Sequence, residues 1–238
     1  IQIDEFSEIE NYLILITKDH LLKKVKEYSL DDKVNNEKIA NIIKISSNQK
    51  LLLFLSSGKV LTLDPSLLPS GKSAPKSFIE FVDVGMNEKL ISVFNGSAQE
   101  KLILVTKLGK GFISNAKQMI TNQKKGKNII NLKKDDELLN VHQYHNTHLV
   151  LISKNEKILI FEANSLPVLN KGTGVQVIKL KEKDFINDSI VINPKEGLSW
   201  IKRGKSRNIK NIDFWIGKRA QVGKKIPKLF NKNLKFNS

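Results

Sequence analysis

The sequence lacks cysteine altogether, and this absence removes several kinds of chemistry at once. Without a thiol there is no disulfide framework, no thiolate zinc site and no cysteine nucleophile, a composition compatible with a reducing cytoplasm. The sequence also lacks an apolar run of about 18 residues and a basic leader with a small-residue cleavage site, so we expect neither a membrane span nor a secretory signal. The first residue is Ile rather than Met, and we therefore expect a piece of a longer polypeptide.

Acidic residues are too few to balance the basic ones. Forty Lys and Arg stand against 24 Asp and Glu, which leaves a net charge of +16, and Arg occurs only at Arg203, Arg207 and Arg219. This surplus predicts a polyanionic partner, nucleic acid first, because Lys side chains that neutralise phosphates release counterions. An anionic membrane surface is the competitor, but no basic amphipathic helix stands out. A compositional bias towards Lys, Asn and Ile is the other explanation for the lysines.

One stretch organises the rest of the chain. Residues 101–114, KLILVTKLGKGFIS, predict a β-hairpin, with two apolar runs around a turn at Leu108-Gly109 where φ can be positive. Similar stretches return at residues 12–25, 50–63, 147–161 and 197–209. The predicted turn positions are His20, Gly58, Gly109, Glu156 and Gly204, at intervals of 38 to 51 residues. Such a period is typical of a propeller-like array with one small sheet per repeat.

Further strands are predicted between the hairpins. Alternating apolar segments follow a polar connection at residues 39–45, 78–84, 129–132 and 175–180, and additional strands are predicted at 89–94 and 137–143. Each repeat thus predicts about four strands, and the five hairpins predict an all-β array of five four-stranded blades. Helical periodicity is scarce, and only residues 211–221 predict either a short terminal helix or an irregular cap.

The composition changes near the end of the sequence. Residues 197–238 carry twelve Lys or Arg against Asp213 alone, a charge of +11, whereas the other 196 residues carry +5. Aromatic residues lie between these charges, at Trp200, Phe214, Trp215, Phe230 and Phe236. The segment predicts a last blade with a basic tail that serves as a docking surface, or else a solvated terminus that its aromatic residues pin to that blade.

Several residues with catalytic potential have a simpler explanation. Among His142, His145 and His148, the first and last share a strand face while the middle one points away, and no carboxylate is near to complete a metal site. The segment KGTG at 171–174 is too short for a phosphate loop. We expect packing roles for Tyr12, Tyr28 and Tyr144. We expect turn positions for the acidic pairs Asp31-Asp32 and Asp135-Asp136. No catalytic residue and no metal ligand is therefore predicted.

The repeats resemble a known family, the C-terminal β-pinwheel domain of the A subunits of bacterial type IIA topoisomerases. The ending, GLSW at 197–200 with WIGKRAQVGKKIPKLFNKNLKF at 215–236, and the loop KGTGVQVIKLK at 171–181 resemble topoisomerase IV A subunits. The gyrase box, QRRGGKG, has its nearest match in QKKGK at 123–127, where Lys replaces Arg and the glycine pair is lost. This departure favours topoisomerase IV over gyrase and argues against strong wrapping of DNA.

The resemblance implies a five-bladed β-pinwheel over residues 1–238, with 197–238 as the last blade and basic tail. It implies a domain that binds duplex DNA without sequence preference and holds or bends it to guide strand passage in decatenation, supercoil relaxation and chromosome segregation. The domain itself would be no enzyme and hold no cofactor. The full-length protein would be an ATP-dependent type II topoisomerase of the bacterial cytoplasm, at the nucleoid, whose N-terminal region and B subunit use ATP and Mg. A gyrase A domain or a basic protein-interaction scaffold are the alternatives.

The expected DNA contacts are phosphates rather than base edges, because lysines are scattered and no recognition helix is predicted. The residues expected to make them are Lys107, Lys110, Lys124, Lys125, Lys127, Lys171, Lys179, Lys202, Arg203, Lys205, Arg207, Lys218 and Arg219.

Overall fold

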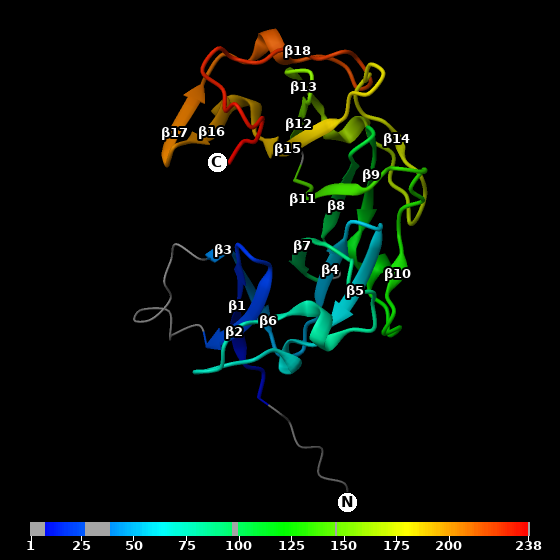
Figure 1. The fold of residues 1–238 in the computed structure, drawn as a ribbon, viewed down its shortest axis with the longest axis vertical. Coiled ribbons are helices and arrows are strands. Elements are labelled where there is room, and N and C mark those ends of the chain that lie inside the picture. Colours follow the sequence, from blue (N-terminus) through cyan, green and yellow to red (C-terminus); the bar gives the residue numbers. More distant parts are fainter. Residues whose placement is uncertain (1–7, 27–38, 97–99, 146, 238) are drawn as a thin grey trace, which may run out of the picture.

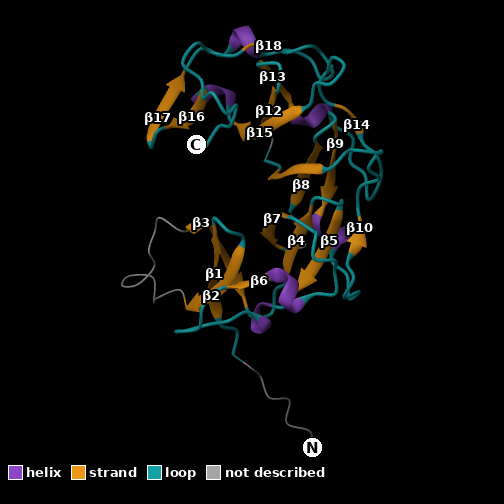
Figure 2. Ribbon diagram, in the orientation of Figure 1, coloured by secondary structure: helices purple, strands orange, loops and turns teal. Residues whose placement is uncertain are grey.

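Five β-sheets follow one another along an arc, with the first and fifth sheets at its two ends (Figure 1). The computed structural model describes residues 8–26, 39–96, 100–145 and 147–237. Strands and loops dominate, and the helical elements are short 3₁₀ turns (Figure 2). In the described part of the chain, no helix is long and apolar enough to cross a membrane. The all-β, propeller-like array predicted from the sequence is confirmed.

Each sheet is built on a hairpin. The five hairpins are β1 (Asn11–Thr17) with β2 (Leu21–Lys26), β4 (Leu51–Leu55) with β5 (Lys59–Leu63), β8 (Lys101–Thr106) with β9 (Lys110–Asn115), β12 (His148–Ser153) with β13 (Lys157–Glu162), and β16 (Leu198–Lys202) with β17 (Lys205–Ile209). All five predicted turn residues adopt positive φ, between 57° and 89°, at His20, Gly58, Gly109, Glu156 and Gly204. The turn chemistry read from the sequence therefore locates every hairpin.

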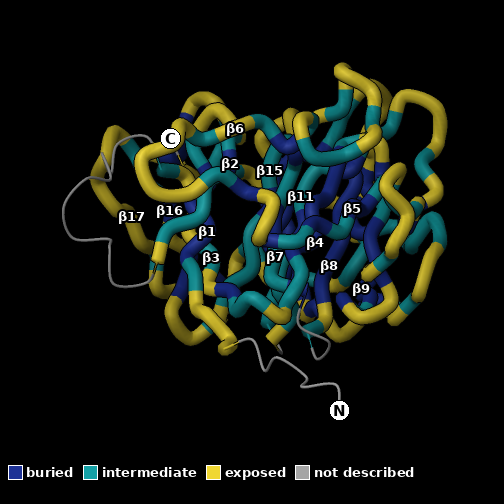
Figure 3. The backbone as a smooth tube through the Cα atoms, turned by 90° about the horizontal axis from the view of Figure 1, so that it is seen from below, coloured by how far each residue is buried: buried dark blue, intermediate teal, exposed yellow. Residues whose placement is uncertain are grey.

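A third strand pairs with the first strand of the hairpin in four of the sheets. These strands are β3 (Ile39–Ser46), β7 (Leu90–Asn95), β11 (Leu138–Gln143) and β15 (Ile186–Ile192). Third strands of neighbouring sheets contact one another, so they line the inner side of the arc. The connections lie on the outside, where most exposed backbone is found (Figure 3).

The fourth, outermost strand of a sheet comes from the repeat that follows it. These strands are β6 (Lys76–Ser77), β10 (Lys127–Asn128), β14 (Val175–Gln176) and β18 (Lys224–Lys225). For example, β10 follows the third hairpin in the chain but pairs with β5 of the second sheet, with Lys127 opposite Val60. Strand pairing thus joins each of these repeats to the preceding one. Four sheets contain the predicted four strands, while the fifth contains β16 and β17 in the described residues.

Short 3₁₀ helices replace some of the predicted strand. They are η3 (Pro65–Leu67), η4 (Phe78–Phe81), η5 (Ala116–Met119), η6 (Ala163–Ser165), η7 (Pro194–Glu196) and η8 (Asp213–Trp215). The strand predicted at 78–84 is wrong, because Ser77 caps η4 by accepting a hydrogen bond from the Ile79 amide at 3.4 Å. The strand predicted at 129–132 is also wrong, since Ile130 makes only an isolated bridge, and of the strand predicted at 175–180 only the first two residues form β14. At 211–221 a single turn, η8, stands in an irregular segment, as in the irregular-cap alternative.

The core lies between successive sheets, in four apolar clusters. Strand β4 shows why its sequence is a continuous apolar run: Leu51, Leu53 and Leu55 pack towards the first sheet, and Leu52 and Phe54 towards the third. Alternate side chains point to opposite faces, and both faces are covered. Burial of each such side chain contributes about 1.5–3 kcal/mol, so the stacking of sheets provides most of the stability.

Candidate nucleic-acid interface

Basic residues gather on the connections that carry the outermost strands. We call residues 116–131, 163–179 and 213–225 the outer belt. Ten Lys or Arg lie in these three segments against a single acidic residue, Asp213. Among the acids outside these segments, Asp136 and Asp184 lie near hairpin turns, whereas Asp83 borders the belt, because its amide donates to the Lys124 carbonyl at 3.4 Å. The three segments themselves carry a strong excess of positive charge, as a phosphate-binding surface requires.

Two glycines bring the basic loops against the sheet. Gly126 and Gly174 immediately precede β10 and β14, with φ of 76° and 77°. A Cβ atom on Gly126 would lie 2.7 Å from the Val60 carbonyl oxygen, and one on Gly174 would lie 2.6 Å from the Gly111 carbonyl oxygen. Only glycine fits these positions, since both the backbone conformation and the close approach exclude a side chain. The glycines of QKKGK and KGTG thus anchor the loops that carry the lysines.

Backbone hydrogen bonds join the belt segments into one continuous structure. The Asn131 amide donates to the Gly172 carbonyl at 2.9 Å, which ties the second belt segment to the first. The Ala220 amide donates to Val177 at 3.0 Å, and the Lys179 amide donates to Gln221 at 3.0 Å, which ties the third segment to the second. The belt crosses the second, third and fourth sheets, so it is long enough to follow a duplex rather than bind a single phosphate.

The structure brings seven of the predicted DNA-binding residues together on this belt. They are Lys124, Lys125, Lys127, Lys171, Lys179, Lys218 and Arg219. Two of them also stabilise the loops: Lys127 Nζ donates to the Gln118 carbonyl at 2.6 Å, and an Arg219 Nη donates to the Gln176 carbonyl at 2.7 Å. Lys110 borders the belt, because it lies opposite Gln176 of β14 in the register.

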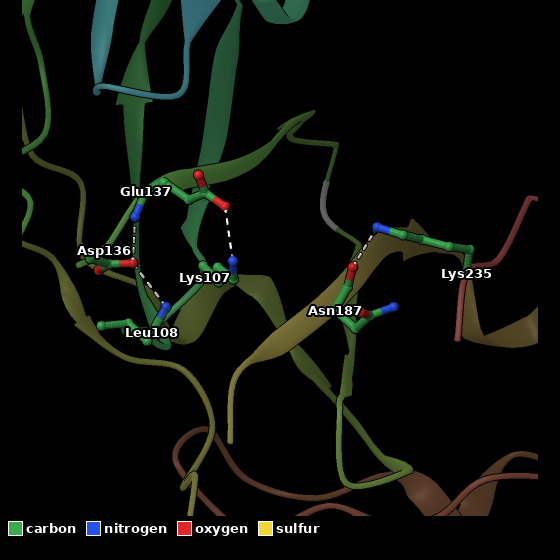
Figure 4. A network of polar contacts seen from close by, with 6 residues as sticks. All are labelled: Lys107, Leu108, Asp136, Glu137, Asn187 and Lys235. Carbon is green, nitrogen blue, oxygen red and sulfur yellow. Dashed lines mark hydrogen bonds and ion pairs between the residues drawn. The ribbon is translucent and has the colours of Figure 1, made fainter. Parts of the chain in front are cut away.

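Lys107 does not belong to this group. It lies at the turn between β8 and β9, where its ammonium pairs with Glu137 at 3.1 Å (Figure 4). The same ammonium lies 4.9 Å from the centre of the Phe185 ring. Asp136 accepts from the Leu108 amide at 2.9 Å, which caps the same turn. Asp136, one of the paired acids expected in turns, thus makes a defined hydrogen bond, while Asp31 and Asp32 lie outside the described residues. The Glu137 carboxylate compensates the charge of Lys107, so this ammonium is less available for a phosphate contact.

The remaining predicted residues form a second group on the fifth hairpin. Arg203, Lys205 and Arg207 are exposed. Lys202 differs from them, because its ammonium donates to the Leu229 carbonyl at 2.8 Å and the Phe230 carbonyl at 3.3 Å. Lys202 therefore fixes the turn end of β16 to the terminal segment, and Arg203, Lys205 and Arg207 follow it in the chain.

Sequence analysis missed Lys224 and Lys225, which form β18 on the belt. The Lys224 ammonium lies 4.7 Å from the centre of the exposed Phe214 ring, a cation–π contact. The signal was present in the sequence, because Gly223 precedes β18 as Gly126 precedes β10. Beside this strand lies a groove of about 620 Å³ that includes Trp215 in its lining.

His142 is the histidine of this stretch with a defined packing role, and it lies on β11 while His148 begins β12, so the two do not share one strand as expected. His142 Nε2 lies 2.7 Å from Ser189 Oγ on the neighbouring inner strand, and Ser189 Oγ donates to Asn140 Oδ1 at 2.8 Å. Burial lowers the pKa of His142 to about 4, so the ring is neutral at physiological pH. Among the described residues, no group of three or more His, Asp or Glu is placed to hold a metal ion.

Comparison with known proteins agrees with this geometry. Residues 100–143 and 147–193 match the family model described as DNA gyrase C-terminal domain, beta-propeller. The A subunit of DNA topoisomerase 4 from Rickettsia felis is 30% identical over 197 residues, which cover 83% of this chain and 26% of that protein. Its counterpart from Caulobacter vibrioides is 30% identical over 201 residues, with coverage of 84% and 26%. The chain thus spans about a quarter of the length of these relatives.

Solved structures share the fold. The crystal structure of the C-terminal domain of DNA topoisomerase IV has a TM-score of 0.79 and 21% identity, and the match covers 96% of this chain and 76% of that one. The E. coli ParC C-terminal domain has a TM-score of 0.77 and 18% identity, with coverage of 92% and 95%. The resemblance expected from the sequence is therefore confirmed: two repeats of the chain match the family of DNA gyrase C-terminal β-propeller domains, most of its length is similar to topoisomerase 4 A subunits, and the fold is that of their C-terminal domains.

Proposed function

We propose that this chain is the DNA-binding C-terminal domain of a topoisomerase IV A subunit, and that it holds or bends duplex DNA to guide strand passage. The observation that carries the proposal is the outer belt, a continuous basic surface over three sheets that contains one acidic residue. Lysines on such a surface contact phosphates, which positions a duplex without reading its sequence. Curvature of the belt along the arc favours a bent path for the DNA.

The wider role follows from the named relatives. The full-length protein would be a type II topoisomerase that decatenates and relaxes DNA in the bacterial cytoplasm, assembled with a B subunit. ATP and Mg²⁺ would act in other parts of that assembly. A gyrase A domain is the less favoured alternative, because both named relatives are topoisomerase 4 proteins and QKKGK at 123–127 lacks the paired glycines of the gyrase box.

A salt series tests the proposal. Duplexes of equal length and equal A·T content, without A-tracts but otherwise unrelated in sequence, should bind with similar affinity, and the logarithm of the affinity should fall steeply and linearly with the logarithm of the salt concentration. The variant K124Q/K125Q/K171Q/K218Q removes four exposed belt charges and should lower the slope by about 0.9 for each phosphate that the protein no longer neutralises.

A matched control removes the same charge elsewhere. The variant K18Q/K89Q/K101Q/K195Q changes four exposed lysines outside the belt and should keep the slope within about one phosphate of the unmodified chain. Equal losses in the two variants would mean that only net charge matters. Weak binding with a flat slope in the unmodified chain would support a protein-interaction scaffold instead.

A further inference from the structure

The fifth hairpin differs from the other four in its free edge. In the other sheets, the second hairpin strand pairs with an added outer strand, whereas β17 pairs only with β16 in the described residues. Residues 203–208 are all exposed, and no hydrogen bond or ion pair within the described chain engages the side chains of Arg203, Lys205 or Arg207. The hairpin stands at the end of the arc (Figure 1). It is a narrow, two-stranded ribbon with cations along its tip and edge.

The base of this ribbon is held firmly. Leu198 and Trp200 are buried, with relative exposures of 0% and 4%, in the cluster shared with the fourth sheet. The Asn208 amide group donates to Ser199 Oγ at 2.7 Å and to the Glu196 carbonyl at 3.1 Å, which braces the two strands. The ribbon is therefore a preorganised projection rather than a loose tail, and its free cations are presented at little entropic cost.

The distribution of arginine sets this ribbon apart. Only three of the forty basic residues are Arg, and two of them, Arg203 and Arg207, lie on the ribbon. The third, Arg219, donates to the Gln176 carbonyl and has a structural role. Protection of a free sheet edge from aggregation requires charge, which lysine provides equally well. Arginine at positions 203 and 207, in a chain so rich in Lys, therefore indicates a role that depends on a property of the guanidinium group that an ammonium lacks.

That property is the planar, weakly hydrated guanidinium group. It sheds water more readily than an ammonium, so it enters narrow, negatively charged grooves at lower cost. The minor groove of A·T-rich DNA is narrow, and its enhanced negative potential attracts inserted arginines. Arg203 lies at the hairpin tip with φ of 50°, beside Gly204, and Arg207 follows on the free edge. No acidic residue occurs between positions 197 and 212 to repel a duplex.

We propose that the ribbon β16–β17 inserts Arg203 and Arg207 into the minor groove of A·T-rich duplex DNA. This inference rests on the proposed DNA-binding function and adds a second mode of contact to it. The outer belt binds phosphates of any sequence, while the ribbon favours duplexes with a narrow minor groove. The domain thereby prefers A·T-rich tracts through DNA shape, without hydrogen bonds that identify individual base pairs.

The test uses the complete 238-residue chain and two duplexes of equal length, one with a central A-tract and one rich in G·C. The unmodified chain should bind the A-tract duplex about fivefold to tenfold more tightly, the size expected from one or two arginine contacts. The variant R203K/R207K keeps every charge and the protected edge, so it should keep the salt slope but reduce the ratio of affinities to near one. Netropsin, which occupies the minor groove, should abolish the preference of the unmodified chain.

The control variant K124Q/K125Q removes belt charge, and it should lower affinity for both duplexes while it keeps their ratio. A ratio near one in the unmodified chain, or a ratio that survives R203K/R207K, would overturn the ribbon proposal while salt-dependent duplex binding still supports the belt. Absence of binding to either duplex would overturn both proposals together.

Discussion

The close approach of Gly174 to Gly111 makes a sharp stability prediction. In Gly174→Ala the new Cβ would lie 2.6, 2.8 and 3.0 Å from the O, C and N atoms of Gly111, all backbone atoms of the central hairpin strand β9. Backbone in the middle of a sheet cannot retract easily, so β14 must move away. Val175 and Gln176 would then lose their pairing with β9, and the Val177 amide would lose its bond to the Gly109 carbonyl at 2.9 Å.

The magnitude follows from these losses. An alanine in the left-handed region costs about 1 kcal/mol. Each of two or three broken hydrogen bonds adds about 1 kcal/mol, and partial exposure of the buried Val177 adds to this. We expect Gly174→Ala to lower the free energy of unfolding by about 3–5 kcal/mol, measured by equilibrium unfolding in urea. Hydrogen exchange should also accelerate over residues 172–180.

Gly71→Ala is the matched control. Gly71 also has positive φ, 61°, but nothing lies within 4 Å of the position of a Cβ atom. This variant should therefore lose only the conformational cost of about 1 kcal/mol. Equal destabilisation of the two variants would refute the argument, because it would mean that the contact with Gly111 relaxes without displacement of β14.

Two further predictions concern buried groups. Because burial lowers the pKa of His142 from 6.5 to about 4, the neutral ring stabilises the fold above pH 6.5, and this contribution is lost as the pH falls towards 4. His142→Gln should reduce the loss of unfolding free energy between pH 6.5 and pH 4 by at most about 3 kcal/mol, measured by urea unfolding at each pH. An unchanged loss in this variant would mean that other groups cause it. Phe236→Ala removes a ring with 1% exposure and should lower the unfolding free energy by about 3–5 kcal/mol in the same assay. Phe214→Ala, at an exposed ring, should cost less than about 1 kcal/mol, and comparable losses would contradict the packing of the terminal segment on the fourth and fifth sheets.

The terminal segment also shows how tertiary contacts use residues that sequence analysis treated as charge. Lys235 Nζ donates to the Asn187 carbonyl at 2.7 Å (Figure 4), and the Phe236 amide donates to Asp188 Oδ2 at 2.9 Å. Burial raises the pKa of Asp188. The aromatic residues at 230 and 236 do pin this segment to the body of the domain, as one of the two interpretations of the basic tail expected.

Local sequence was enough to locate the five hairpins, because an apolar run, a turn residue that tolerates positive φ and a second run are all features of neighbouring residues. Gly58, Gly109 and Gly204 could be identified as turn residues without any knowledge of their surroundings in the fold. Composition likewise indicated a polyanionic partner, since net charge does not depend on the fold.

The strand that completes each sheet, in contrast, depends on long-range packing. The outer strands are two residues long, too short for a periodic signal, and their partners lie more than 50 residues away. Close backbone approach at Gly126 and Gly174 places two of them, β10 and β14. The contacts of the lysines at the candidate interface also depend on long-range packing. The sequence alone does not distinguish Lys107 from Lys124. In the fold, Lys107 pairs with Glu137, just before β11, whereas Lys124 lies on the outer belt, in the connection that leads to β10. Charge is a property of the sequence, but the partner of each charge is set by the packing of sheets against one another.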